Sequence, residues 1–431
     1  MRGRLNLFQA TMLRWRDLHP YSAVHMVRVA KPCDPTRLKD QIEARLQAAG
    51  LTGFTLDRSR CRFEFRGGPV AIELTTLPGG ADARATARLE IIRQLNLPFA
   101  RDGGFSPFRF FVIDGGTSFD VGLAYDHFIA GGDSIAVLLK YCLDGYGDER
   151  MTDAYRWTPR LYPHTYRRLF LRHLGSALRG LAYLPDLGAS ARRAYRAPCH
   201  GTGDASNGFL CFRIDPQGFA GLRKATKTWG VTVNELFLAM LLTALDPAAA
   251  GRRTAARRQQ LGVASIVNLR SELESGARES FGQFLSSLRI SHPVPPGIGL
   301  EQLAASVHSD TYRIRTRRLY LQSLLALGVS GFMWRFLSSE QRRCFFAKHY
   351  PIWGGITSLY VDPLWNGASD AAPLSEYVRA VSTGPLAPLV FAITTLGDAV
   401  WLGVTFRTGD VTAEAAEAAA RGFLRCIASL T

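Results

Sequence analysis

Alternating apolar and polar residues indicate strands along this chain, and apolar residues spaced three or four apart indicate helices. Between positions 119 and 126, large apolar residues occupy every second position, which is typical of a strand. Continuing that alternation places His127 on the apolar face. Gly131 and Gly132 then mark a turn, and apolar residues from position 135 onward recur at helical spacing. The pattern therefore predicts a strand, a histidine at its end, a glycine turn and an amphipathic helix.

The predicted elements fall into two groups. Those of the first group are a strand at 23–29, a helix at 35–49, a hairpin at 62–75, a helix at 81–97, and paired strands at 107–113 and 119–126. Those of the second group are strands at 209–214, 262–269, 286–290, 389–395 and 400–406, with a capped helix after 232 and further helices at 313–336 and 413–430. Several prolines and an arginine-rich helix at about 166–184 separate the groups. Because 431 residues exceed the usual size of one domain, we expect an α/β (α+β) protein with lobes at 1–185 and 200–431.

The composition is that of an ordinary folded protein, with 47% hydrophobic and 20% charged residues. The seven cysteines are odd in number and scattered without a Cys-x-x-Cys pair, which predicts a reducing compartment, no disulfide framework and no zinc site. The N-terminal residues lack the apolar core of a signal peptide. The longest uncharged apolar stretch, 319–334, is shorter than the roughly 20 residues that span a bilayer. We therefore expect a soluble, cytoplasmic monomer without a bound metal.

The formal charge of +16 at pH 7 is the unusual feature of the composition. The arginines form separate groups and accompany no zinc-finger, RNA-recognition or helix-turn-helix signature, so nucleic acid is not an expected partner. Four explanations stay open: an acidic carrier protein, the phosphates of coenzyme A, an anionic membrane surface, or plain solvated surface. The groups at 252–258 and 313–318 are the leading candidates for a patch near an active site. The basic-then-apolar stretch 313–336 leaves peripheral membrane contact open.

The histidine, the glycine turn and the following helix together resemble the active-site motif of the CoA-dependent acyltransferase superfamily. That superfamily includes chloramphenicol acetyltransferase, plant BAHD enzymes and the condensation domains of nonribosomal peptide synthetases, and its pattern is His-His-x-x-x-Asp-Gly. Here Asp126 stands at the first histidine and His127 at the catalytic one. Gly132 stands at the motif glycine and Ser134 at the serine that usually follows. Gly131 replaces the motif aspartate, whose role in the family is mainly structural.

Three further motifs follow in the order found in condensation-type acyltransferases. They are a capped Thr-Val-Asn helix at 232–234, a strand that ends before Arg270, and a Gly-Gln-Phe segment at 282–284 where the family has Gly-Asn-Phe. The BAHD motif Asp-Phe-Gly-Trp-Gly is absent from the sequence, which favours the condensation branch. The resemblance covers nearly the whole chain. It implies two chloramphenicol-acetyltransferase-like lobes with the active site in a tunnel between them, as in a stand-alone condensation domain.

The resemblance also implies an activity, transfer of an acyl group from a coenzyme A or carrier-protein thioester to a hydroxyl or amine. His127 would act as general base on the acceptor, which can be a small molecule or a lipid. Backbone N–H groups near Gly132 would stabilise the tetrahedral oxyanion. No cofactor is bound in this scheme, because acyl-CoA or an acyl-phosphopantetheine carrier is itself the donor. The competing interpretation is a non-catalytic relative that binds an acyl carrier or another partner, and the lost aspartate supports it.

The supporting residues carry open alternatives. Asp133 is either the N-cap of the predicted helix or a substitute for the missing loop aspartate. Arg270 matches the family arginine that pairs with that aspartate, so it needs Asp133 or Asp126 as a partner, or it faces water. Asp126 could orient His127, but alternation along the strand turns its side chain to the opposite face and favours solvation. Ser358, in a segment resembling the family's Ser-Asn-Leu, either lines the site or merely sits on a strand.

Overall fold

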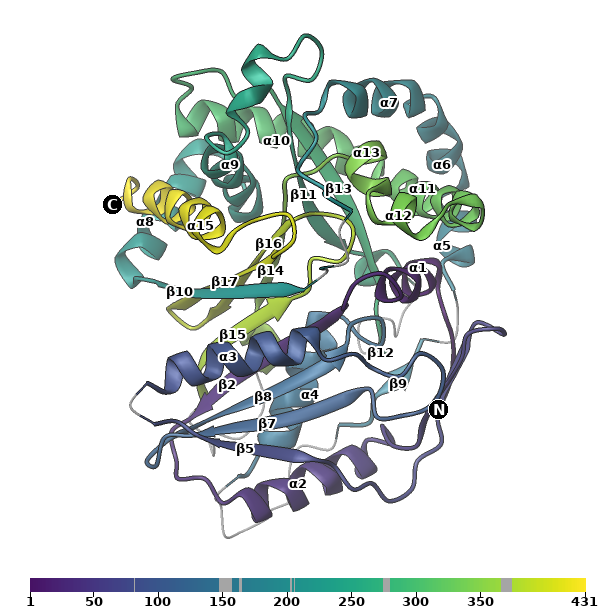
Figure 1. Cartoon of the computed structure of the whole chain (residues 1–431), viewed down its shortest axis with the longest axis vertical. Helices are drawn as coiled ribbons and strands as arrows, with labels where there is room; N and C mark the ends of the chain where they lie inside the picture. The colour runs from purple at the N-terminus through teal and green to yellow at the C-terminus, as the bar shows by residue number, and fades with distance from the viewer. Residues whose placement is uncertain are drawn as a thin grey trace.

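The computed structural model describes the chain except residues 81, 147–156, 163–164, 202–203, 205, 274–279 and 366–373. The described residues form two lobes, one above the other in Figure 1, each built on a mixed sheet with helices packed against it. The lower sheet has the strand order β15-β2-β8-β7-β5, and the upper sheet has the order β10-β17-β16-β14-β11-β13. The expected α/β class with two lobes is therefore confirmed.

Both faces of the lower sheet are covered, because successive side chains of a strand point in opposite directions and every residue of β8 is buried. One face of β2 packs against α3, and the other packs on the core shared with α2 and α4. The antiparallel pairing of β7 with β8 confirms the hairpin that ends before the histidine. The elements of this lobe are β2 (Ser22–Val29), α2 (Pro35–Ala48), β5 (Leu74–Pro78), α3 (Ala83–Asn96), β7 (Phe108–Asp114), β8 (Phe119–Asp126), α4 (Gly132–Leu143) and β15 (Leu374–Val381).

A small second sheet in the lower half corrects one expectation. The sequence predicts a hairpin at 62–75, but the two strands there belong to different sheets. The first, β4, pairs with β1 and β3, whereas β5 pairs in parallel with β7. Alternation identifies a strand but not its partner, so the two glycines between them were misread as a closing turn. The small sheet consists of β1 (Arg2–Arg4), β3 (Phe54–Asp57), β4 (Arg62–Phe65) and β6 (Gly103–Gly104), and α1 (Leu7–Arg16) follows its first strand.

The upper lobe packs its sheet on a buried central helix, α9, which lies between α10 and α15. The predicted capping box is present, because the Thr232 hydroxyl accepts from the Glu235 N–H and the Glu235 carboxylate accepts from the Thr232 N–H. The elements are β10 (Asn207–Ile214), α8 (Pro216–Trp229), α9 (Val233–Leu245), η1 (Ala250–Thr254), β11 (Leu261–Asn268), η2 (Arg270–Glu272), β13 (Leu285–His292), α10 (Leu300–Thr316), β14 (Gly354–Tyr360), α14 (Asp362–Trp365), β16 (Leu389–Leu396), β17 (Ala399–Arg407) and α15 (Ala413–Ala428).

The two halves of the chain are interleaved at β15. This strand comes from the second half of the sequence, yet it pairs antiparallel with β2 at the edge of the lower sheet. It also contacts β16 and β17 of the upper sheet. A strand drawn from the far half of the chain therefore lies where the lobes meet, and its side chains can reach the space between them.

The segments on the right of Figure 1 are more broken than the sequence predicts. One arginine-rich helix is expected at about 166–184, but two short helices, α5 and α6, stand there, and a third, α7, begins where the expected helix would end. Of the three, α6 packs on α11. The helix expected at 313–336 is also interrupted, at Arg318, whose φ of 50° is left-handed and incompatible with a continuing helix. These elements are β9 (Arg160–Leu161), α5 (Arg167–Arg172), α6 (Leu174–Leu181), α7 (Leu184–Arg193), β12 (Ser280–Phe281), α11 (Tyr320–Met333), η3 (Trp334–Phe336), α12 (Ser339–Arg343) and α13 (Phe345–His349).

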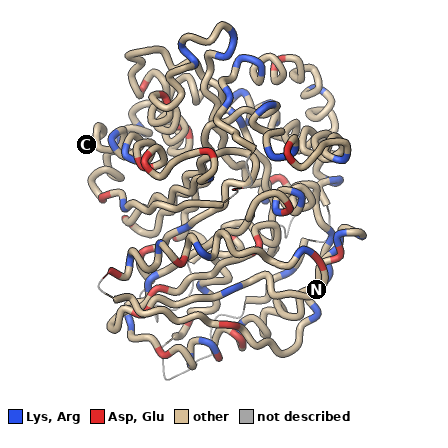
Figure 2. Tube along the Cα trace, viewed as in Figure 1, with Lys and Arg blue, Asp and Glu red and all other residues tan. Residues whose placement is uncertain are grey.

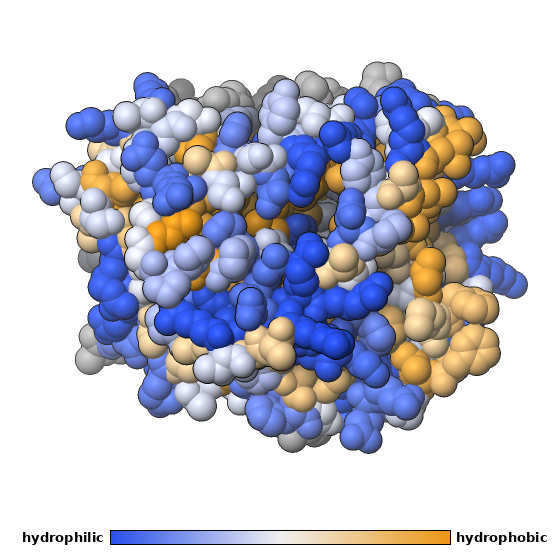
Figure 3. All heavy atoms as spheres, turned by 90° about the horizontal axis from the view of Figure 1, so that it is seen from above, coloured by the Kyte–Doolittle hydropathy of each residue, from blue (hydrophilic) through white to orange (hydrophobic). Residues whose placement is uncertain are grey.

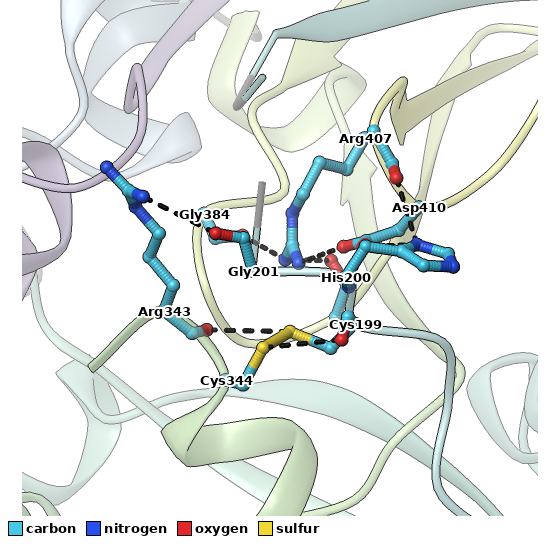
Figure 4. Close-up of a disulfide and its surroundings, with 10 residues drawn as sticks. Cys199, His200, Gly201, Arg343, Cys344, Gly384, Arg407 and Asp410 are labelled. Carbon is cyan, nitrogen blue, oxygen red and sulfur yellow. Dashed lines mark hydrogen bonds and ion pairs between the residues drawn. A yellow bond between two sulfur atoms is a disulfide. The ribbon is translucent and has the colours of Figure 1, made fainter. Parts of the chain in front are cut away.

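A disulfide joins Cys199 to Cys344, 145 residues apart in sequence (Figure 4). The expectation from cysteine spacing that the chain contains no disulfide is therefore wrong for this pair. Spacing could not reveal it, because only the tertiary fold brings the segment before β10 against the start of α13. The bridge removes the argument for a reducing compartment, since disulfides are rare in reducing cytosol.

Within the described part of the chain, no single helix is long and apolar enough to cross a membrane, although α8 and α9, joined at a sharp bend, pass that test as a pair.

Candidate functional site

A cavity of about 200 Å³ lies between the lobes, and residues of both lobes form its wall. The lower lobe supplies the end of β8 and the start of α4, and β15 supplies Arg379. The upper lobe supplies parts of β11, β13 and β14. The expected interlobe position of the site is thus occupied by a real hollow, and His127 lies on its wall.

His127 follows the last residue of β8 and is held mainly by its backbone and by packing. Its N–H donates to the Tyr21 carbonyl at 3.4 Å, and its carbonyl accepts from Gln283 Nε2 at 3.1 Å. The imidazole centroid lies 5.4 Å from the ring of Tyr21 and 5.8 Å from the ring of Tyr125. The ring nitrogen Nδ1 is buried and has no hydrogen-bond partner among the described residues. No carboxylate therefore orients this imidazole in the described part of the structure.

Burial keeps His127 neutral. Together with the nearby positive charge of Arg379, it lowers the pKa of His127 to about 3. A general base must be unprotonated before it can accept a proton, and this imidazole meets that condition at pH 7. A pKa that low also means a weaker base than an ordinary histidine, because proton affinity falls with the pKa.

The glycine turn is closed by a contact from the upper lobe. The Gly131 N–H donates to the Gly282 carbonyl at 3.0 Å, and a Cβ on Gly131 would lie only 2.8 Å from Gln283 Oε1. The amide of Gln283 thus fills the space beside Gly131 while its other end holds the His127 carbonyl. An aspartate at this position would require Gln283 to move. The change from the family pattern at 131 is therefore matched by a longer side chain at 283, in the Gly-Gln-Phe segment.

Asp133 pairs with Arg270 across the lobes. The Arg270 Nε lies 3.6 Å from Asp133 Oδ2, and Asn268 Nδ2 donates to the same oxygen at 2.6 Å. Arg270 Nη2 also donates to Ser134 Oγ at 2.6 Å. The N-cap of α4 is Gly131, without a side-chain capping bond, so the expectation that Asp133 caps the helix is wrong. Of the alternatives left open by the sequence, the structure supports Asp133 as the substitute for the missing aspartate.

Asp126 is not solvated, contrary to expectation. Its side chain points away from the cavity, as alternation predicts, but only 1% of the residue is exposed and it forms an ion pair with Arg16. The physical reason is α1, a helix absent from the predicted elements, which covers that face of the strand end. Burial raises the pKa of Asp126 to about 6 even though Arg16 favours its charged form. Asp126 therefore acts on the packing of α1 rather than on the imidazole of His127.

Arg379 is the site residue that sequence reasoning missed. It lies on β15, is only 3% exposed and lines the cavity. Its Nε donates to Thr394 Oγ1 at 2.9 Å, and its Nη2 donates to the carbonyls of Thr357 and Ile393, each at 2.8 Å. The third nitrogen, Nη1, lies 3.2 Å from the place where a Cβ on Gly132 would stand. The only signal in the sequence was a charged residue within the apolar second half of a strand, Tyr377 to Val381.

Of the remaining residues predicted from the sequence, one lines the cavity and the two arginine groups do not. Ser358 is on β14 and lines the cavity, so of its two alternatives the structure favours the first. Neither arginine group, 252–258 or 313–318, lines it, and Arg252 is fully buried in an ion pair with Asp246. Lys and Arg residues are instead spread over both lobes (Figure 2). Among the described residues no cluster of three or more His, Cys, Asp or Glu side chains is arranged to hold a metal ion.

No family model and no curated protein matches this chain. Its fold does match solved structures. The first condensation domain of the calcium-dependent antibiotic synthetase, in complex with a substrate analogue, is 16% identical with a TM-score of 0.70 over 100% of this chain and 97% of that chain. The condensation domain of the Monacolin K polyketide synthase MokA is 13% identical with a TM-score of 0.68 over 100% and 97%. A chain of the complex of the X-domain and OxyB from teicoplanin biosynthesis is 13% identical with a TM-score of 0.61 over 99% and 93%.

These matches define the class of fold. The chain has the two-lobed, chloramphenicol-acetyltransferase-like architecture of condensation domains over its full length, as the resemblance in sequence predicted. At such low identity the matches establish architecture alone. What the site does must be argued from its own residues.

Proposed function

We propose that this chain is a condensation-type acyltransferase that moves an acyl group from a thioester to a hydroxyl or amine acceptor. The observation that carries the proposal is His127, an uncharged imidazole on the wall of a cavity built by both lobes. The solved structures that this chain resembles in fold are condensation domains of synthetases. That likeness supports a thioester of a carrier protein or of coenzyme A as the donor.

The proposed reaction needs only one proton carrier. The acceptor hydroxyl or amine gives its proton to His127 as its lone pair attacks the thioester carbonyl carbon. The tetrahedral oxyanion then collapses, the carbon–sulfur bond breaks, and the leaving thiolate takes the proton back from His127. The first-turn N–H groups of α4, which begins at Gly132, have no acceptor inside the helix and point toward its N-terminal end. They are our candidates for stabilising the oxyanion.

The alternative function is binding without catalysis. The X-domain, which shares this architecture, was solved in complex with OxyB. The replacement of the motif aspartate by Gly131 favours this alternative. The Asp133–Arg270 pair counts against binding without catalysis. Arg270, which matches the arginine of the family pattern, still has a carboxylate partner, although that partner stands at position 133 instead of 131.

The test is a screen of acyl-CoA and acyl-carrier-protein donors against hydroxyl and amine acceptors, read as free thiol released and as acylated product. We expect at least one donor–acceptor pair to turn over, and the His127→Gln protein to lose that turnover. His19→Gln is the matched control, because His19 is also buried with a pKa of about 3 but does not line the cavity. Tight carrier binding with no product from any pair would assign the chain to the binding alternative.

A further inference from the structure

Arg379 brings a buried positive charge to the cavity wall without a matching negative one. Among the described residues its hydrogen bonds go to the neutral oxygens of Thr394, Thr357 and Ile393, and no carboxylate lies within ion-pair distance. Asp133 is the one carboxylate among the described residues of the cavity wall. That carboxylate already accepts from Asn268 and pairs with Arg270, so its charge favours protonated Arg379 only from a distance.

The other groups around the guanidinium do not supply the missing charge. The titratable or charged side chains nearest to it are His25, Tyr125, His127, Asp133 and Tyr377. Burial raises the pKa of both tyrosines and lowers the pKa of both histidines, so all four are uncharged at pH 7. A buried charge is costly unless it is paired. The cavity therefore presents an unneutralised cation beside the proposed base.

We propose that one of the two substrates carries a carboxylate that binds Arg379 Nη1 in the cavity, next to His127. This inference rests on the proposed function and names a substrate class for the same site. A planar carboxylate suits a guanidinium, because their hydrogen bonds are charge-assisted and directional. Elsewhere the wall offers serine and threonine hydroxyls and asparagine amides, which are uncharged. We therefore expect the remainder of the substrate to carry no second charge.

The bound carboxylate would also act on His127. The charge of Arg379 disfavours protonated His127, and a carboxylate on the guanidinium offsets that charge. The base would then be stronger with the substrate in place than in the empty cavity. Arg379 is a positioning residue in this scheme, because it holds the substrate and tunes the base but takes no proton.

The first experiment uses the imidazole of His127 as the probe. Protein labelled with carbon-13 at the histidine rings is titrated with butyrate and, as the uncharged match, with butyramide. We expect butyrate alone to move the His127 signal and to raise its pKa. In Arg379→Gln the pKa of His127 should be higher without ligand and should no longer respond to butyrate. Arg379→Lys keeps the charge and should keep part of the response.

Equal responses to butyrate and butyramide would overturn the proposal even if neither variant folds, because that comparison uses the unaltered protein. The second experiment compares malonyl-CoA with acetyl-CoA as donors, and amino acids with their amides as acceptors. The carboxylate-bearing member of one pair should have a kcat/KM at least about 10-fold higher, a preference that Arg379→Gln removes. Transfer without that preference would sink this inference and leave the acyltransferase standing. A response of His127 to butyrate without transfer from any donor would support the carboxylate site and contradict the acyltransferase proposal.

A separate observation concerns the outer face of α6, α7 and α11. Leucines on α6 recur at i, i+4 and i+7 and are exposed, and α11 with η3 exposes a second apolar stripe beside them. The two helices are joined where Gln322 Nε2 donates to the Ala177 carbonyl at 3.0 Å. In Figure 3 hydrophobic residues gather on the right-hand side, with hydrophilic residues projecting among them, and this is the side on which these helices lie in Figure 1. We use the name apolar face for the exposed large apolar residues of α5, α6, α7, α11 and η3, which are Leu171, Leu174, Leu178, Leu181, Leu184, Leu187, Val329, Phe332, Met333 and Phe336.

The charges that flank the apolar face favour one kind of partner. From 167 to 193 the sequence holds six arginines against the single acidic residue Asp186, and from 319 to 337 it holds Arg335 and no acidic residue. Helices that combine exposed leucine and phenylalanine with flanking arginine match the pattern of interfacial membrane-binding segments. We infer that this face docks on a membrane surface containing anionic lipid.

Vesicle sedimentation tests the docking. The protein should pellet with phosphatidylcholine vesicles that contain phosphatidylserine and be released by high salt, and it should stay behind with phosphatidylcholine alone. Leu178→Glu with Phe332→Glu should abolish pelleting, whereas Leu89→Glu on α3, an equally exposed leucine elsewhere, should not. If the native protein does not pellet with either kind of vesicle, or pellets equally with both, the proposed docking on anionic lipid is refuted. A dimer in solution that the same double variant dissociates would assign the face to a second copy instead.

Discussion

The strongest quantitative expectation from the structure is that His127 resists protonation in the folded, unliganded protein. At pH 5 a histidine with the ordinary pKa of about 6.5 would be about 97% protonated, whereas one with a pKa of about 3 is about 1% protonated. In a carbon-13 titration of the histidine rings, the His127 signal, identified by its loss in His127→Gln, should keep its neutral position down to about pH 4.5.

The same shift has a consequence for stability. The unfolded chain takes up a proton at this residue as the pH falls below about 6.5, but the folded protein does not until about pH 3, so folding free energy is lost as the pH falls through that window. From pH 7 to pH 4.5 the loss attributable to His127 amounts to about 2.5 kcal/mol. Urea unfolding at the two pH values should show the native protein losing that much more than His127→Gln. An inflection of the His127 signal near pH 6.5, together with equal losses in the two proteins, would refute the reasoning.

Three further expectations concern the packing around the site and the bridge. Asp133→Ala and Arg270→Ala should be non-additive in a double-mutant cycle of unfolding free energies, with a coupling of about 1–3 kcal/mol, whereas additive losses would mean that the pair is incidental. Asp126→Ala should cost about 3–5 kcal/mol in urea unfolding because it strands a buried guanidinium, and a neutral effect would contradict the burial of this ion pair. Replacing Cys199 and Cys344 by serine should lower stability by up to about 5 kcal/mol, since the bridge closes a loop of 145 residues; intact protein that melts identically with and without reductant would show that the bridge is not formed.

Local patterns predicted the elements that lead into the site, and tertiary contacts decided what the site contains. The period of two through 119–126 and the helical spacing after 135 fix where His127 stands, because these signals are written in adjacent residues. The same kind of signal misplaced the hairpin at 62–75, because strand pairing depends on which sheet each strand joins. Arg379 could not be predicted as a site residue for a related reason. No local pattern indicates that β15, near the end of the chain, pairs with β2, near its start.

The replacement of the motif aspartate shows where resemblance needs a structure. A comparison of motifs marks Gly131 as the loss of an aspartate, but in the structure Asp133 lies near Arg270 and the Gln283 amide fills the space beside the glycine. Both adjustments join residues from opposite lobes. Sequence spacing alone left Asp133 as a helix cap or a substitute, and the pairing with Arg270 could be seen only once the lobes were placed together.

The central claim is that His127 removes the proton from the acceptor during acyl transfer. The most direct test is the turnover of the best donor–acceptor pair by the native protein and by His127→Ala, measured as free thiol and product at equal concentrations of folded enzyme. Loss of a general base should lower the rate by about 10² to 10⁴-fold while the unfolding transition persists. Unchanged turnover in a folded His127→Ala protein would contradict the account.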